Sequence, residues 1–207
     1  MGEMTRGGRV YLAADGLTSV LVDTGGFDGT LGGGQLIESA HRKPHEVRMI
    51  LLTHAHFNHA ANAAGLRELS GTTVAASRET ADALVDPPQP RGGLLRRADR
   101  FPPVHVDRVL EPGEKLDLCG GIEVIDAPGH APGSLAFHFV ALGVLCFGDA
   151  AQLEGDTLAP PPARHCVDRA AAVETVERLA AIDVRCLAPG HGFPLVDGKL
   201  PRKLPRH

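Results

Sequence analysis

LLTHAHFNHA, residues 51–60, ends an apolar run in a group of three histidines. Residues 47–53 are apolar over most of their length, which is typical of a β-strand covered on both faces. Residues two apart in an extended segment point the same way, so His54 and His56 can converge on one point beyond this strand. His59 begins an alanine-rich segment for which we predict a helix. Imidazole is the commonest ligand for metals such as zinc, so the stretch predicts a metal site.

Three further polar residues follow segments that have the pattern of strand ends. His130 follows "DAPG", Asp149 follows "LCFG" and His191 follows "LAPG". A glycine stands before each, and glycine permits a sharp exit from a strand or a close approach of the backbone. A lone histidine is more often structural than a ligand. Five histidines and one aspartate at such positions in one chain favour a shared metal centre.

Strand-like and helix-like segments alternate along the chain. Residues 9–14 and 18–24 predict a β-hairpin around the pair Asp15-Gly16, which favours a tight turn. Residues 168–182 carry apolar side chains at helical spacing and predict an amphipathic helix. Further strands are predicted over residues 47–53, 72–77, 107–110, 121–127, 134–140, 143–149 and 184–189, and further helices over residues 33–42, 59–69 and 78–85. Strands followed by helices in both halves indicate layered α and β structure.

The composition argues against several classes of function. With 207 residues and 43% hydrophobic content, the chain can bury a sizeable core. A net charge of -4 and 4% aromatic residues argue against nucleic-acid binding, and no apolar run approaches the roughly 20 residues of a membrane span. The N-terminal residues lack the apolar core of a signal peptide, and the four cysteines are scattered. We therefore expect a cytoplasmic protein that acts on a small molecule, without nucleic-acid or membrane partners, and leave its oligomeric state open.

The motifs "LVDTGG", "THAHFNH", "APGHAPGS", "FGDA" and "PGHG", in this order, resemble those of the metallo-β-lactamase superfamily. The resemblance runs from about residue 9 to residue 195 and implies a single domain over residues 1–207. It implies an α/β fold, the αβ/βα four-layer sandwich, with metals at one edge of two packed sheets. The motifs are specific for fold and metal binding but not for substrate, because the superfamily includes lactonases, thioesterases, glyoxalase II enzymes, nucleases and iron dioxygenases.

The resemblance implies two metal positions that share a bridging carboxylate. The residues that match its ligands are His54, His56 and His130 for the first ion, His59 and His191 for the second ion, and Asp149 between them. Asp23 matches an acidic residue that orients metal-binding groups, although a turn-capping role is an alternative. We expect one or two zinc ions, with iron or manganese as alternatives.

Asn58 departs from the family pattern, in which an aspartate precedes the last histidine of the first motif. That aspartate is expected to bind the second metal and to handle a proton. An asparagine is neutral and cannot serve as a base, so we expect a weak second metal site and treat Asn58, with Asp149, as a candidate catalytic position. A structural alternative is that Asn58 forms the N-cap of the helix that follows it.

Three functions are compatible with these residues. The leading hypothesis is a zinc-dependent hydrolase of a small ester, thioester or lactone, in which the metal activates water. The second is a persulfide-type dioxygenase with a single iron held by His54, His130 and Asp149, because this mechanism depends less on a carboxylate at position 58. The third is a binding protein that keeps the fold without efficient catalysis.

Other polar residues carry weaker signals. A loop rich in Pro, Gly and Arg, residues 86–103, precedes the second half of the chain, and its arginines are Arg91, Arg96, Arg97 and Arg100. These arginines could hold an anionic substrate, or they could form a solvated basic loop. His138 and His165 match no ligand position, and we interpret both as structural.

Overall fold

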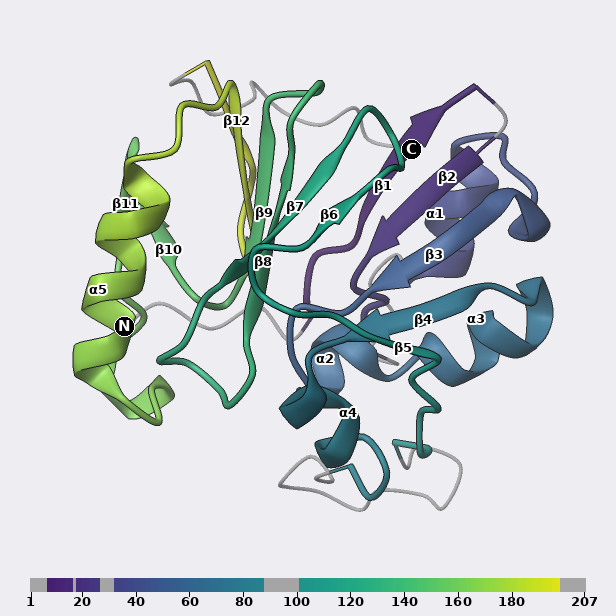
Figure 1. Ribbon diagram of the computed structural model, residues 1–207, viewed down its shortest axis with the longest axis horizontal. Coiled ribbons are helices and arrows are strands. Elements are labelled where there is room, and N and C mark those ends of the chain that lie inside the picture. The colour runs from purple at the N-terminus through teal and green to yellow at the C-terminus, as the bar shows by residue number, and fades with distance from the viewer. Residues whose placement is uncertain (1–6, 17, 27–31, 88–100, 198–207) are drawn as a thin grey trace.

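The computed structural model describes residues 7–16, 18–26, 32–87 and 101–197. The arginines of the basic loop, residues 86–103, all lie outside the described residues. Among the described residues, the first half of the chain builds one β-sheet and the second half builds another (Figure 1). The candidate residues, which were predicted at strand ends, therefore belong to two different sheets.

The first sheet begins with the predicted hairpin. Its strands, in spatial order, are β1 (Tyr11–Asp15), β2 (Thr18–Val22), β3 (Val47–Leu51), β4 (Thr73–Ala76) and β5 (Arg108–Val109). Strands β1 and β2 are antiparallel, and Gly16 in the turn between them has φ 55°, a left-handed conformation that favours glycine. Strands β2 to β5 run parallel to one another.

The second sheet is mostly antiparallel. Its strands, in spatial order, are β13 (Leu195–Val196), β12 (Cys186–Pro189), β9 (Val144–Gly148), β8 (Leu135–Phe139), β7 (Ile122–Asp126) and β6 (Lys115–Leu116). Strands β12 and β9 are parallel, so both of them end at the same edge of the sheet. A separate small sheet pairs β10 (Gln152–Glu154) with β11 (Thr157–Ala159).

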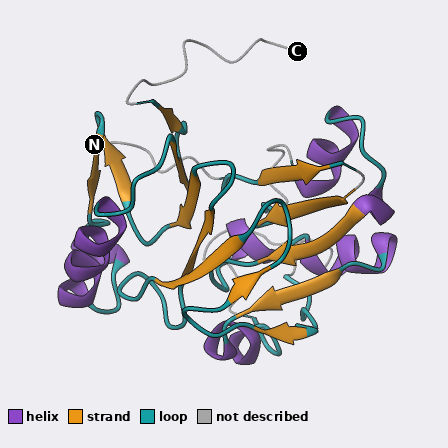
Figure 2. Cartoon of the chain, turned by 45° about the horizontal axis from the view of Figure 1, so that its top comes forward, coloured by secondary structure: helices purple, strands orange, loops and turns teal. Residues whose placement is uncertain are grey.

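Helices cover the outer faces of both sheets (Figures 1 and 2). Their bounds are α1 (Gly33–Ser39), α2 (Phe57–Ala60), α3 (Ala63–Ser70), α4 (Arg78–Ala83) and α5 (Arg169–Ala180), with short 3-10 helices η1 (Pro44–Glu46) and η3 (Ala163–His165). Helices α1 to α4 lie beside the first sheet, and α5 lies beside the second.

Alternating side chains of the central strands divide the interior into three cores. In β3, Met49 and Leu51 face the core between the two sheets, whereas Ile50 packs beneath the helices of the first sheet. In β9, Cys146 faces the same central core and Phe147 packs toward α5. The layers are therefore helices, sheet, sheet and helix, which confirms the predicted αβ/βα sandwich. The prediction that residues 47–53 form a strand covered on both faces is also confirmed, by β3.

The interpretation of Asn58 as a helix N-cap is wrong. Helix α2 begins at Phe57, and its N-cap residue is His56, so Asn58 lies within the helix. The Asn58 side chain faces His191 rather than the helix backbone. The single helix expected over residues 59–69 is also divided, because α2 ends at residue 60 and α3 starts at residue 63.

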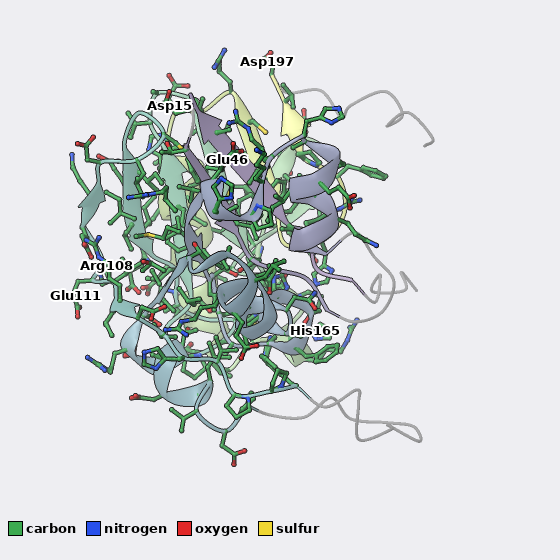
Figure 3. All side chains as sticks on the ribbon, turned by 90° about the vertical axis from the view of Figure 1, so that its right-hand side faces the viewer. Asp15, Glu46, Arg108, Glu111, His165 and Asp197 are labelled. Carbon is green, nitrogen blue, oxygen red and sulfur yellow. The ribbon has the colours of Figure 1, made fainter. Side chains whose placement is uncertain are left out.

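The outside of the sandwich carries most of its charge. Labelled side chains such as Arg108, Glu111 and Asp197 lie at the periphery (Figure 3). An ion pair between Lys115 of β6 and Glu123 of β7, at 2.9 Å, lies on this outer surface. In the described part of the chain, no helix has the length and apolar character needed to cross a bilayer.

Candidate metal centre

Strand ends from both sheets meet at one edge of the sandwich. Five of the six candidate residues lie just outside a strand or helix: His54 comes after β3, His56 is at the N-cap position of α2, His130 follows β7, Asp149 follows β9 and His191 follows β12. His59 lies within α2. The two sheets are joined directly here, because the Leu135 backbone N–H donates to the Thr53 carbonyl at 2.9 Å.

Glycines permit the close approach that this edge requires. Gly148 has φ 52°, and a Cβ on it would lie 2.5 Å from Thr53 Oγ1. A Cβ on Gly190 would collide with the Asp149 carboxylate. A Cβ on Gly129, which has φ 122°, would collide with the backbone of α5. The glycine before each of the three later polar residues therefore serves the close backbone approach that the sequence predicted.

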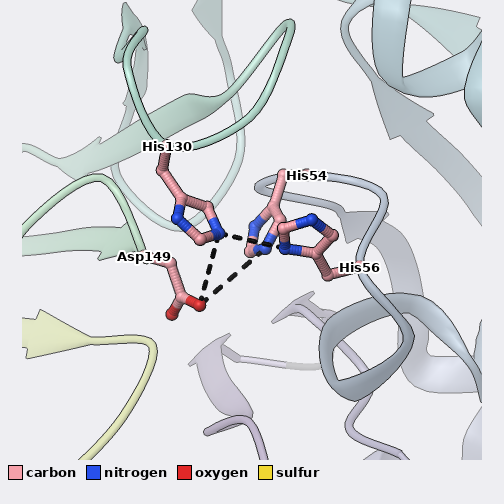
Figure 4. A group of neighbouring side chains, drawn as sticks. All are labelled: His54, His56, His130 and Asp149. Carbon is pink, nitrogen blue, oxygen red and sulfur yellow. Dashed lines mark hydrogen bonds and ion pairs between the residues drawn. The ribbon is translucent and has the colours of Figure 1, made fainter. Parts of the chain in front are cut away.

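The first half of the centre gathers His54, His56, His130 and Asp149 (Figure 4). One ligand atom from each lies within 4.8 Å of the others. His130 Nε2 is 3.0 Å from His56 Nδ1 and 3.5 Å from Asp149 Oδ2. His54 Nε2 is 4.0 Å from Asp149 Oδ2. Nitrogen and oxygen donors thus surround one small volume.

The second half of the centre gathers His59, His191 and Asp149. His59 Nε2 lies 3.3 Å from Asp149 Oδ1, and His191 Nε2 lies 3.3 Å from Asp149 Oδ2. The Asn58 amide nitrogen is 3.0 Å from His191 Nε2. Asp149 therefore faces both halves, and the predicted convergence of all six side chains is confirmed by these distances.

Hydrogen bonds orient three of the imidazoles from behind. His59 Nδ1 donates to Asp23 Oδ2 at 2.8 Å. His130 Nδ1 donates to the His165 carbonyl at 2.7 Å. His54 Nδ1 lies 3.0 Å from the hydroxyl of Thr53, the residue before it. Each of these rings consequently directs its Nε2 atom toward Asp149.

Asp23 supports the centre from beneath. It is 2% exposed, and one carboxylate oxygen accepts the Thr53 backbone N–H at 2.8 Å while the other accepts from His59. Its φ of 58° lies in the left-handed region, which aspartate adopts more readily than most residues. The contact with His59 agrees with the orienting role that the resemblance implied.

His165 makes a contribution that sequence reasoning missed. Its imidazole matches no ligand position, but its backbone carbonyl fixes His130. A carbonyl carries no residue-specific signal, and η3 brings it to the site from 35 positions along the chain. Only the tertiary fold could have revealed this contact.

Burial and charge set opposite protonation preferences among the histidines. Burial lowers the pKa of His54 well below its ordinary value, and burial with the neighbouring His130 lowers the pKa of His56 to about 4. For His59, burial acts against the charged form, but Asp149 and Asp23 outweigh it and raise its pKa to about 10. Burial likewise opposes the charge on Asp149, yet the adjacent histidines hold its pKa well below the usual range.

This donor set fits a divalent metal ion. His54 Nε2 and His59 Nε2 are buried, and neither has a hydrogen-bond partner among the described residues. Buried polar atoms are normally paired, so two imidazole nitrogens left open beside one carboxylate call for a ligand. The carboxylates of Asp149 and Asp23 beside His59, which raise its pKa, also favour positive charge at this point. Imidazole with carboxylate suits zinc, and also iron.

The chain belongs to the metallo-beta-lactamase superfamily, whose family model matches residues 5–191. It is 31% identical to a hydroxyacylglutathione hydrolase of Cereibacter sphaeroides over 125 residues, which cover 59% of this chain and 41% of that relative. It is 28% identical to a hydroxyacylglutathione hydrolase of Acidiphilium cryptum over 196 residues, covering 93% of this chain and 67% of the relative.

A solved structure with similar architecture supports the same assignment. TTHA1623, whose crystal structure is of a di-iron-bound form, has a TM-score of 0.70 and 28% identity, with 96% of this chain and 93% of that chain covered. Both of the sequence relatives carry the name of a hydrolase. The chain spans less than half of the Cereibacter relative's length.

Proposed function

We propose that the protein is a metal-dependent hydrolase of a small ester, thioester or lactone. The observation that carries this proposal is the convergence on Asp149 of imidazole nitrogens from both sheets, two of them buried and without a hydrogen bond to any described residue. The hydroxyacylglutathione hydrolases that the chain resembles favour a thioester among the three substrate types.

Each residue of the centre has a defined task in this proposal. The first ion would be held by His54, His56, His130 and Asp149, and the second by His59, His191 and Asp149. When bound, such an ion lowers the pKa of water toward neutrality and polarises a carbonyl group. Asp149 supplies negative charge to both positions, and Asp23 holds His59 with its Nε2 directed toward Asp149.

Asn58 weakens both metal binding and proton transfer at the second metal position. Its side chain reaches the metal-facing nitrogen of His191, where the family has an aspartate. The amide adds no negative charge to balance a dication and cannot accept a proton as a carboxylate does. We therefore propose high occupancy of the first position, low occupancy of the second, and slow turnover.

Metal analysis of the purified protein, with assays on a panel of thioesters, esters and lactones, tests the proposal. Zinc with hydrolysis of any class supports it, and a charged and a neutral member of each class would show whether an anionic substrate is preferred. One iron per chain with oxygen consumption on a persulfide would replace it with the dioxygenase hypothesis. Metal binding without turnover on the whole panel would favour a binding protein.

We also propose that this activity takes place in the cytoplasm. All four cysteines are free, two of them buried in the cores. Free thiols are typical of a reducing compartment. Localisation of the tagged protein in intact cells tests this proposal, and recovery outside the cytoplasm would contradict it.

A further inference from the structure

His191 lacks the support that His54, His59 and His130 have. For three of them, the nitrogen that faces away from Asp149 has a hydrogen-bond partner. His191 Nδ1 is buried, and none of the described residues forms a hydrogen bond with it. A ring without such a bond depends on its backbone for its position. What fixes the backbone around His191 therefore decides how well this ligand is placed.

Arg9 holds that backbone on both sides of His191. Its backbone N–H donates to the Gly190 carbonyl at 2.7 Å, and its Nε donates to the Gly192 carbonyl at 2.6 Å. The guanidinium carbon also lies 4.9 Å from the centroid of the Phe193 ring, within the range of a cation–π contact. Glycine is the most conformationally free residue, and Gly192 has φ 83°, so this loop needs external contacts to hold one conformation.

The N-terminal segment that carries Arg9 also lies against α2. A Cβ on Gly8 would collide with the Asn58 carbonyl oxygen, so only a glycine lets the segment pass so close. Farther along, the Tyr11 hydroxyl donates to the Pro189 carbonyl at 2.7 Å. One short segment thus contacts both pieces of chain that line the second metal position.

We propose that Arg9 is a positioning residue that orients His191 toward the second metal ion. It acts through the carbonyls on either side of His191 and does not contact the ion. Asp23 orients His59 through its ring, whereas Arg9 orients His191 through the backbone on either side of it. That a metal ion occupies this position rests on the proposed function. The contacts by which Arg9 holds the loop around His191 do not depend on it.

The test compares zinc affinities of variants in an Asn58→Asp background, where the second ion should bind tightly enough to measure. Arg9→Ala removes the Nε bond to the Gly192 carbonyl and the contact with Phe193 but keeps the backbone bond to Gly190. It should weaken binding of the second ion about tenfold and leave the first unchanged, as expected when part of the support of a ligand is lost. Arg9→Lys keeps the charge but loses the Nε contact, so it should restore little. Arg42→Ala is the matched control, because Arg42 donates to the Gly16 carbonyl at 2.7 Å in the hairpin turn of β1 and β2.

A second measurement needs no metal. The Gly190 backbone N–H donates to the Gly148 carbonyl at 2.7 Å, and its hydrogen exchange in metal-free protein should be several-fold faster in Arg9→Ala than in Arg42→Ala. Unchanged affinity for the second ion overturns the proposal, and so does equal weakening of both ions. If the protein binds no metal ion, the proposed function fails, and the exchange rate at Gly190 alone decides whether Arg9 holds the loop.

Discussion

Asn58→Asp is the most informative single change at the centre. The side chain at position 58 reaches to 3.0 Å from His191 Nε2, which is itself 3.3 Å from Asp149 Oδ2. A carboxylate there would lie within about 6 Å of Asp149 and would repel it by about 3 kcal/mol at an effective dielectric constant of about 20. A dication about 4 Å away would attract it by about 8 kcal/mol on the same scale.

The attraction of the new carboxylate to the dication therefore exceeds its repulsion by Asp149. The cost of desolvating the new carboxylate removes much of this difference. We expect a net gain of about 1.4 to 2.8 kcal/mol, which is tenfold to a hundredfold tighter binding of the second ion. Turnover should rise with occupancy, because the new carboxylate can also accept a proton. The fold should be preserved, because Asn58 faces His191 and caps no helix.

Zinc titration against a competing chelator, with metal counted per chain, measures the effect. Gln35→Glu is the matched control, because it makes the same amide-to-acid change at an exposed position of α1. If the present sequence already binds two ions tightly and Asn58→Asp adds nothing, the amide is an adequate ligand and the charge argument is wrong. An equal gain in zinc affinity in Gln35→Glu would show that the effect comes only from the change in net charge.

Three further outcomes are expected. Asp23→Asn keeps the shape of the side chain but removes the charge beside His59, so zinc affinity at the second position should fall about tenfold or more by titration; no change would leave Asp23 with a turn role alone. Because the pKa of His59 is raised to about 10, an ion must displace its proton at pH 7, and affinity at the second position should rise up to tenfold per pH unit until about pH 10. The pKa of His56, about 4, predicts that the first position loses its ion only near that pH. Isothermal titration at several pH values measures the metal affinity of both positions, and the same pH dependence at both would contradict this prediction. Gly129→Ala should destabilise the protein by roughly 1–3 kcal/mol in urea unfolding, since its Cβ meets the backbone of α5, whereas Gly65→Ala, with open space in α3, should gain about 0.5–1 kcal/mol; similar effects at both would contradict the packing described at Gly129.

The sequence predicted the parts of the fold that have strong local signals. The Asp15-Gly16 turn indicated the hairpin of β1 and β2, and the apolar run of β3 indicated a strand covered on both faces. Two-residue strands such as β5 and β13 form only by pairing with a neighbour, so composition cannot predict their extent. The N-cap interpretation of Asn58 was wrong because the sequence does not distinguish two roles for a polar residue before a helical pattern. Such a residue can cap the helix, or it can direct its side chain toward a partner far along the chain.

The candidate centre was predictable as a set of residues but not as a set of contacts. His54, His56 and the glycine-preceded residues stand out by type and spacing. The carbonyl of His165 and the hold of Arg9 on the loop around His191 do not, because backbone carbonyls carry no sequence signature. Contacts of this kind join residues as far apart as 183 positions, and only the assembled sandwich brings them together.

The division of the centre between the two sheets has a consequence for assembly. His54, His56 and His59 come from the half of the chain that builds the first sheet, and His130, Asp149 and His191 come from the other half. An ion bound by both sets is a cross-link that closes a long chain loop, about 70 residues from His56 to His130 at the first position and about 90 from His59 to Asp149 at the second. Tight metal uptake during refolding would therefore report the docking of the two halves, because neither half alone carries a complete set of ligands.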